Sequence, residues 1–239
     1  MDKKLIVLGI ESSCDDTSAA ILKGSNVLSN IISSQDIHKQ YGGVVPELAS
    51  RAHQQNIIPV VDTAIKSAKI NRSDIDVIAY TKGPGLLGSL LVGSSFAKSF
   101  SYSLSKPLVS VNHMKAHILA HFIEDEKNSS PDFPFICLTV SGGHTQIVLV
   151  NSFTEMKIIG TTLDDAAGEA FDKSAKVLGL EYPGGPLIDK FSKSGNINAF
   201  TFGKPKIKEL DFSFSGLKTS IMNKINSSLM TNPKFIDEN

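Results

Sequence analysis

Two histidines stand four residues apart in the segment His113-Met114-Lys115-Ala116-His117. On a helix this spacing places both imidazoles on one face, where two neutral imidazoles can bind one divalent metal ion. We expect His121 to extend the same face, since three of the six histidines then fall within nine residues. A metalloprotease helix of this spacing carries a glutamate directly after the first histidine, whereas this chain has Met114. The segment indicates a metal-binding helix or, as the alternative, exposed polar residues on a helix surface.

A polar turn, Ser141-Gly142-Gly143, offers a different chemistry. Glycine's freedom of φ lets the backbone approach a ligand and direct successive N–H groups at a phosphate. A similar polar segment, Ser13 to Thr17, stands 128 residues earlier, so the two turns together would hold a phosphate from two sides. Taken alone, each is no more than a turn. Asp15 and Asp16 suit a metal ion, its waters, or a substrate hydroxyl or amine better than a phosphate.

A third polar run, Thr162 to Lys173, contains four acidic residues. Asp164 and Asp165 precede a helical pattern, and acidic side chains there are expected to cap the helix N-terminus. Asp172 lies two turns further along and would suit a ribose hydroxyl or a substrate amine. Gly184-Gly185 lies in an expected Gly/Pro turn and offers a second close approach of the backbone to a ligand.

The elements that must position these residues occur in a repeated order. Each polar turn lies between two strand-like runs, which predicts two β-hairpins, and a third apolar run follows each of them. The hairpin strands are Leu5 to Glu11 and Ser18 to Leu22 in the first copy, and Phe135 to Val140 and Gln146 to Val150 in the second. Because the spacing changes by a single residue, an ancestral duplication is favoured.

Further sequence patterns predict the remaining helices and strands of the first half of the chain. Val45 to Ala68 has helical periodicity, and Pro59 is expected to divide or kink that helix. Val77 to Thr81 predicts a buried strand, Leu87 to Leu104 a helix, and Val109 to Asn112 another strand. This order resembles the ribonuclease-H-like lobe that is duplicated in the actin, Hsp70 and sugar-kinase superfold. We therefore expect an α/β fold with duplicated lobes: residues 1–112 form the first lobe, and residues 113–239 form an inter-lobe metal helix and a partial second lobe.

The second lobe is expected to be incomplete. Helices are expected from Asp165 to Leu178 and from Ser215 to Leu229, but no β-branched run after Leu163 matches Val77 to Thr81. By the logic of the repeat, the second sheet lacks strands and the sequence stops about 100 residues early. A fragment is favoured over a natural short form.

Composition narrows the functional classes. The 24 basic and 24 acidic residues cancel, so a nucleic-acid partner would have to bind a local patch. Two cysteines, Cys14 and Cys137, do not make a disulfide framework, which indicates a reducing cytoplasm. No apolar run is long enough to span a membrane.

Seven segments resemble one family, the tRNA threonylcarbamoyladenosine transferases, formerly called O-sialoglycoprotein endopeptidases. The resemblance covers the whole chain in order. The segments are Gly9 to Thr17, Gly42 to Arg51, Gly83 to Leu86, His113 to His117, Val140 to Thr145, Asp164 to Lys173 and Phe212 to Lys218.

The resemblance implies transfer of a threonylcarbamoyl group from threonylcarbamoyl-AMP to the exocyclic amine of the adenosine at tRNA position 37. It implies one divalent metal ion of the iron type on His113 and His117, and two partner subunits, a non-catalytic paralogue and an ATPase. The substrate contacts carried over by motif are Thr139, Val140, Ser141, Gly142, Gly143, Asp172, Gly185 and Asp189. No covalent nucleophile is needed, because the adenylate is an activated mixed anhydride with a good leaving group.

The chain departs from this family in two places. The family usually has Glu-Gly between the metal histidines, where this chain has Lys115 and Ala116. The family's C-terminal aspartate ligand and nucleotide-binding asparagine have no counterpart before Asn239, so the chain alone is not expected to modify tRNA. Two alternatives to the transferase function are a non-catalytic scaffold paralogue and a small-molecule kinase of the same superfold. The two-histidine helix argues against both.

Overall fold

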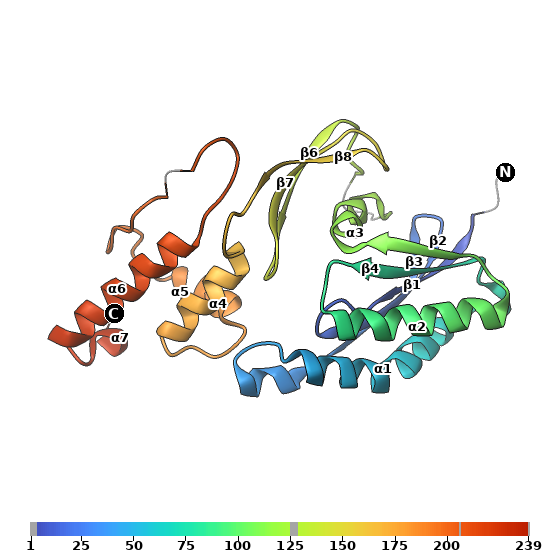
Figure 1. The fold of residues 1–239 in the computed structure, drawn as a ribbon, viewed down its shortest axis with the longest axis horizontal. Coiled ribbons are helices and arrows are strands. Elements are labelled where there is room, and N and C mark those ends of the chain that lie inside the picture. Colours follow the sequence, from blue (N-terminus) through green and yellow to red (C-terminus); the bar gives the residue numbers. More distant parts are fainter. Residues whose placement is uncertain (1–3, 125–128, 206, 239) are drawn as a thin grey trace. The chain divides into compact units, whose positions relative to one another are not determined.

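Two units make up the chain, Met1–Pro131 and Asp132–Asn239. The structure, a computed structural model, describes residues 4–124, 129–205 and 207–238 (Figure 1). By this division the two-histidine helix lies with the first unit, whereas the sequence predicts that the second part begins at residue 113. In the described part of the chain, no helix combines the length and the apolar character needed to cross a membrane.

A five-stranded mixed sheet forms the first unit, in the order β3-β2-β1-β4-β5. Strand β1 (Ile6–Glu11) pairs antiparallel with β2 (Asp16–Lys23), which pairs antiparallel with β3 (Asn26–Ser34). On its other side β1 pairs parallel with β4 (Val77–Gly83), and β4 pairs parallel with β5 (Leu108–Asn112). The first predicted hairpin and both later strands are therefore confirmed.

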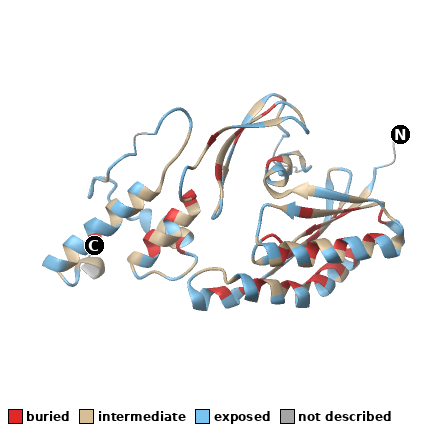
Figure 2. Ribbon diagram, viewed as in Figure 1, coloured by how far each residue is buried: buried red, intermediate tan, exposed pale blue. Residues whose placement is uncertain are grey.

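Two long helices cover one face of this sheet. Helices α1 (Pro46–Ser67) and α2 (Leu87–Leu104) pack against each other and against the strands (Figures 1 and 2). Alternate residues of a strand point to opposite faces, so Leu8 and Ile10 of β1 face these helices. The core on this side also contains Ile21, Ile57, Val61, Ala64, Ile75 and Ile78.

Helix α1 runs through Pro59 without a break, so the expectation of two separate helices is wrong. Proline removes one backbone hydrogen bond from a helix interior. The buried residues on both sides of it, Ile57, Val60 and Val61, pack into the core, and this packing offsets the loss of that hydrogen bond. Two short 3-10 helices, η1 (Asp36–Tyr41) and η2 (Arg72–Asp74), flank α1.

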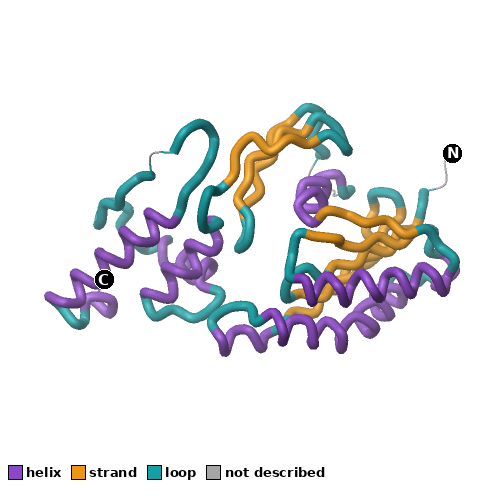
Figure 3. The backbone as a smooth tube through the Cα atoms, in the orientation of Figure 1, coloured by secondary structure: helices purple, strands orange, loops and turns teal. Residues whose placement is uncertain are grey.

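Helix α3 (His113–Leu119) follows β5 directly and lies on the opposite face of the sheet from α1 and α2 (Figure 3). A 3-10 helix, η3 (Ala120–Phe122), continues it. The odd-numbered residues of β1, among them Gly9 and Glu11, point to the face that α3 partly covers.

A three-stranded antiparallel sheet, ordered β6-β7-β8, opens the second unit. Its strands are β6 (Phe135–Val140), β7 (Thr145–Val150) and β8 (Met156–Thr161), so the second predicted hairpin is confirmed. Within the residues that the structure describes, β6 pairs with β7 alone. That the second lobe is incomplete stays a prediction.

Four helices follow in the second unit: α4 (Ala167–Val177), α5 (Gly184–Ser192), α6 (Ser215–Thr231) and α7 (Phe235–Glu238). Helix α4 packs against α5 and α6. The Gly/Pro turn expected at Gly184-Gly185 is wrong, because these residues form the first turn of α5. Pro186 fits there, since the N–H groups of a first turn have no partner inside the helix.

Candidate functional site

The two histidines of α3 approach each other through their Nε2 atoms. Nε2 of His113 and Nε2 of His117 are 3.1 Å apart, and the rings lie edge to face. The helix starts where the Asn112 side chain accepts a hydrogen bond from the Lys115 N–H at 3.1 Å. His121 lies in η3, beyond the end of α3, and its place on the histidine face stays a prediction.

This pair fits a divalent metal ion. Two imidazole nitrogens that bind one ion at about 2.1 Å lie about 3.0 to 3.4 Å apart, which matches the 3.1 Å separation of the two Nε2 atoms. Burial lowers the pKa of His117 and the neighbouring His113 adds to this effect, so the metal-binding neutral form is favoured. Across residues 4–124, 129–205 and 207–238, no cluster of three or more His, Cys, Asp or Glu side chains is placed to hold a metal.

Glu11 lies beside His113, on the face of the sheet that carries α3. Its Oε2 accepts hydrogen bonds from the Thr81 hydroxyl at 2.6 Å and from Nδ1 of His113 at 3.1 Å, and its Oε1 accepts one from the Ser13 N–H. Desolvation would raise the pKa of Glu11, but these hydrogen bonds outweigh it and lower the pKa to about 2. The carboxylate therefore stays ionised.

A cavity of about 470 Å³ opens at this point of the first unit. Glu11, Thr81, His113 and His117 line it together with other residues of β1, β2 and β4. The histidine pair and the carboxylate thus share one recess whose other lining residues are mostly apolar.

The first hairpin tip, which joins β1 to β2, makes hydrogen bonds with three other segments of the first unit. The carbonyl of Ser13 accepts a hydrogen bond from the Leu86 N–H at 2.7 Å, and the carbonyl of Cys14 accepts one from the Ser89 hydroxyl at 3.1 Å. The buried His53 contacts the Cys14 carbonyl at 3.0 Å through Nε2 and the Thr17 hydroxyl at 2.8 Å through Nδ1. The tip is therefore a rigid part of the first unit.

A side chain at position 85 would collide with this tip. A Cβ on Gly85 would lie 2.5 Å from the Ser13 carbonyl oxygen, so the close approach itself requires glycine. Asp15 is half-buried and Asp16 is exposed at the start of β2.

The surroundings of Cys14 disfavour the thiolate form that acts as a nucleophile. Desolvation, together with the charges of Asp15 and Asp16, raises the pKa of its thiol to about 12. Because the thiolate is the reactive form of cysteine, the tip offers no covalent catalyst.

The second hairpin tip, in the second unit, is closed by Ser141 and His144. The Ser141 N–H donates to the His144 carbonyl at 2.9 Å, and the His144 N–H donates to the Ser141 hydroxyl at 3.0 Å. The N–H groups of Gly142 and Gly143 make no hydrogen bond to any described residue. They are exposed and available to an anion.

The conformational reason that we expected for these glycines is wrong. Neither Gly142 nor Gly143 has a positive φ, and no atom lies within 4 Å of the Cβ position of either. The fold itself therefore does not require glycine at either position.

Thr139 and Val140 lie in β6 next to this tip. The Thr139 hydroxyl oxygen is buried and has no hydrogen-bond partner in the described part of the chain. A buried hydroxyl normally has a partner, so a bound ligand or a water molecule would satisfy it. The Val140 side chain is exposed on the other face of the strand.

Gly168 is a residue near the tip that sequence reasoning missed. Its N–H donates to the Ser141 carbonyl at 3.1 Å, and a Cβ on it would lie 2.7 Å from that oxygen. The start of α4 is thereby joined to the hairpin tip. The run of small residues Ala166-Ala167-Gly168 is the sequence signal that could have indicated this close packing.

Asp172 and Gly185, both predicted from the resemblance, lie together. Oδ1 of Asp172 accepts the N–H groups of Gly184 at 2.8 Å and Gly185 at 3.1 Å, so it caps the N-terminus of α5. Asp189 lies further along α5, exposed, and pairs with Lys193 at 3.2 Å.

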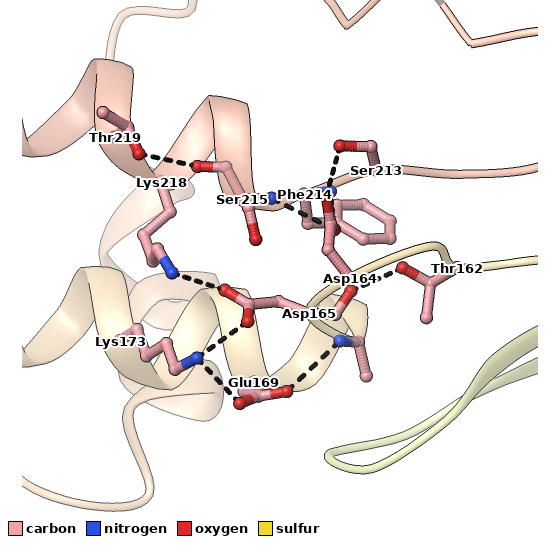
Figure 4. A network of polar contacts seen from close by, with 11 residues as sticks. Thr162, Asp164, Asp165, Glu169, Lys173, Ser213, Phe214, Ser215, Lys218 and Thr219 are labelled. Carbon is pink, nitrogen blue, oxygen red and sulfur yellow. Dashed lines mark hydrogen bonds and ion pairs between the residues drawn. The ribbon is translucent and has the colours of Figure 1, made fainter.

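Asp164 and Asp165 join α4 to α6, as Figure 4 shows, and do not cap α4 as expected. Asp164 accepts hydrogen bonds at the start of α6, from the Ser213 hydroxyl at 2.6 Å and the Phe214 N–H at 2.8 Å. Asp165 binds Lys173 of α4 at 2.7 Å and Lys218 of α6 at 2.8 Å. Tertiary packing therefore turns Asp164 toward α6, and Asp165 bridges lysines of α4 and α6.

Replacing Asp165 with asparagine is expected to destabilise the second unit at pH 7 by about 1 to 3 kcal/mol, because two ammonium groups lose a largely buried charged partner. Hydrogen bonds from Lys173 and Lys218 lower the pKa of Asp165 below its ordinary 3.8. This contribution is therefore complete above about pH 4 and lost as the pH falls through the lowered pKa.

Urea unfolding followed by circular dichroism at pH 7 and at pH 2.5 measures this effect. The difference between wild type and Asp165→Asn should shrink at the lower pH. Asp189→Asn, which breaks an exposed ion pair, serves as the control and should change little. An Asp165→Asn difference that is equal at both pH values would contradict the assignment.

Comparisons with known proteins place these features in context. A family model described as tRNA N6-adenosine threonylcarbamoyltransferase (TsaD) matches residues 26–236. A relative of that name from Riemerella anatipestifer is 62% identical over 237 residues, which cover 99% of this chain and 70% of the relative. One from Christiangramia forsetii is 58% identical over 238 residues, or 100% of this chain and 70% of the relative.

One solved structure resembles the chain over nearly its whole length. It is component A of (R)-2-hydroxyglutaryl-CoA dehydratase from Acidaminococcus fermentans, with a TM-score of 0.50. The match covers 98% of this chain and 71% of that one at 14% identity, so the likeness concerns the fold alone.

Proposed function

Because the chain belongs to the tRNA N6-adenosine threonylcarbamoyltransferase family, we propose that it transfers a threonylcarbamoyl group from threonylcarbamoyl-AMP to the N6 amine of the adenosine at tRNA position 37. The observation that carries the proposal is the family match from residue 26 to residue 236, which includes residues of both units. The family predicted from the sequence motifs is thereby confirmed.

The transfer needs no covalent intermediate. The amine nitrogen forms a bond with the carbonyl carbon of the threonylcarbamoyl group, while the bond from that carbon to the phosphate oxygen breaks. AMP leaves with the bonding electrons, and the amine gives up one proton. The raised pKa of Cys14 fits this direct attack, because the exposed thiol of the first tip stays protonated.

The second hairpin tip is the proposed phosphate site. The N–H groups of Gly142 and Gly143 point to no partner in the described chain and suit phosphate oxygens. The buried Thr139 hydroxyl is available for a further hydrogen bond. Such donors would stabilise the negative charge that grows on the leaving phosphate.

The α5 region is the proposed site for the nucleoside. Asp172 uses Oδ1 to cap α5, which leaves Oδ2 for a ribose hydroxyl. Gly185 offers backbone close to that carboxylate, and Asp189 offers a second carboxylate on the same helix.

His113 and His117 are the proposed ligands of one divalent metal ion, of the iron type by family resemblance. When bound, such an ion polarises carbonyl or phosphate oxygens as a Lewis acid. The 3.1 Å separation of the two Nε2 atoms supports this assignment, and the chain's part is to hold both imidazoles in place.

The family resemblance supports three further proposals. The two units descend from one ribonuclease-H-like lobe of the actin, Hsp70 and sugar-kinase superfold, as the matching meanders β1-β2-β3 and β6-β7-β8 suggest.

The chain acts on tRNA with a non-catalytic paralogue and an ATPase subunit. Its two free cysteines suit a reducing cytoplasm.

A reconstituted transfer assay tests the proposed function. The chain, its two partner subunits, tRNA and threonylcarbamoyl-AMP are incubated, and the tRNA nucleosides are analysed by mass spectrometry. We expect threonylcarbamoyladenosine at position 37. Unmodified tRNA would contradict the proposal if the Riemerella anatipestifer relative, shortened to the residues that match this chain, forms product under the same conditions.

A further inference from the structure

Glu11 makes contacts that the proposed transfer chemistry does not by itself require. One carboxylate accepts three hydrogen bonds from three parts of the first unit: the Thr81 hydroxyl of β4, the Ser13 N–H of the first tip, and Nδ1 of His113 on α3. We infer that Glu11 is a positioning residue of the histidine pair, which holds His113 in the tautomer and orientation that present Nε2 to a metal ion. This inference rests on the proposed metal site.

The tautomer follows from the chemistry of the contact. An ionised carboxylate only accepts hydrogen bonds, so the 3.1 Å contact with Oε2 requires a proton on Nδ1 of His113. A neutral imidazole carries one ring proton, and Nε2 then keeps its lone pair for a metal. This nitrogen is the one that lies 3.1 Å from Nε2 of His117.

The neighbouring Ser13 hydroxyl shows what Glu11 prevents. Its oxygen lies 3.3 Å from the same Nδ1 of His113 and can either accept or donate a hydrogen bond. Without the carboxylate, the hydroxyl could donate to Nδ1, and the imidazole proton would then reside on Nε2. That tautomer blocks the nitrogen that faces the metal.

Glutamine cannot replace this carboxylate. All three partners of Glu11 donate, and both carboxylate oxygens are used. The amide of Glu11→Gln would turn an NH2 group toward either the Ser13 N–H or the Thr81 and His113 donors. In the first orientation two donors meet at the Ser13 N–H; in the second, Nδ1 of His113 must accept, which places the imidazole proton on Nε2. The variant therefore keeps the size of the side chain but no longer holds His113 in the Nδ1–H tautomer.

Nitrogen NMR tests the tautomer directly. Spectra of the metal-free chain with 15N-labelled histidine are recorded for wild type and for Glu11→Gln. We expect the Nδ1–H tautomer of His113 in wild type and a shift toward the Nε2–H tautomer in the variant. An Nε2–H tautomer in wild type would overturn the inference, and this measurement needs no variant that folds. An unchanged tautomer in a folded Glu11→Gln would overturn it as well.

Titration with Co²⁺ alone, followed by calorimetry, tests the consequence for metal binding. We expect Glu11→Gln to bind Co²⁺ about 10- to 100-fold more weakly than wild type, the usual effect of removing a hydrogen-bond partner of a metal-binding histidine. Glu124→Gln is the matched control, since it makes the same change at an exposed carboxylate of the first unit. We expect it to bind as wild type does.

The outcomes separate the two proposals. A wild-type chain that binds no Co²⁺ would contradict the proposed metal site, whatever the tautomer of His113. Equal Co²⁺ affinity of wild type and a folded Glu11→Gln would contradict the role of Glu11 and leave the metal site standing.

Discussion

Alanine at His113 or His117 is expected to remove the bound metal and to lower threonylcarbamoyl transfer by about 100-fold or more. The described part of the chain holds no cluster of three metal-binding side chains, so the loss of one imidazole leaves a single protein ligand. Metal content is measured by mass spectrometry of the purified protein, and transfer by the nucleoside assay described above.

His121→Ala is the matched control for this experiment. It removes a histidine from the same segment, but His121 lies in η3 beyond the helix that carries the pair. We expect wild-type metal content and transfer. A double variant of His113 and His117 that retains one metal ion per chain would refute the assignment of these ligands.

Valine at position 143 is expected to weaken the binding of AMP by about 10- to 100-fold, equivalent to losing one or two charged hydrogen bonds. The position has no positive φ, and no protein atom lies within 4 Å of its Cβ, so the fold should tolerate the change. The branched side chain would instead occupy the space that a phosphate needs beside the free N–H groups. Calorimetry with AMP measures the affinity.

Gly203→Val controls for the substitution itself. Gly203 also has no atom within 4 Å of its Cβ and no positive φ, and it lies in the same unit. The control should bind AMP as wild type does, with the same unfolding midpoint. If Gly143→Val binds AMP equally well, the second hairpin tip is only a turn.

Local patterns predicted most of the elements. The helix expected from Leu87 to Leu104 is α2, and both hairpins lie where alternating apolar residues and polar turns place them. These features depend on neighbouring residues, which is why periodicity finds them. Helix α5 was missed because it begins with Gly184-Gly185-Pro186, residues that usually interrupt helices, and because its N-terminus is capped by Asp172 from α4.

The candidate site was predictable only where its residues are close in sequence. The His113 and His117 pair follows from helical spacing, but its contact with Glu11 joins residues 102 positions apart. That contact exists because β1 lies parallel to β4 and β4 to β5, which leads directly into α3. Likewise, Asp164 binds the start of α6 across 50 residues, and nothing in the local sequence distinguishes this from capping α4.

The protonated state of Cys14 has a consequence for the chemistry of the cell. Peroxide, disulfides and alkylating reagents attack the thiolate, which is scarce at neutral pH when desolvation and two adjacent aspartates hold the pKa near about 12. Cys14 is exposed, and its raised pKa leaves a smaller fraction of thiolate than an ordinary surface cysteine has. We therefore expect Cys14 to react with oxidants more slowly than a surface cysteine without acidic neighbours.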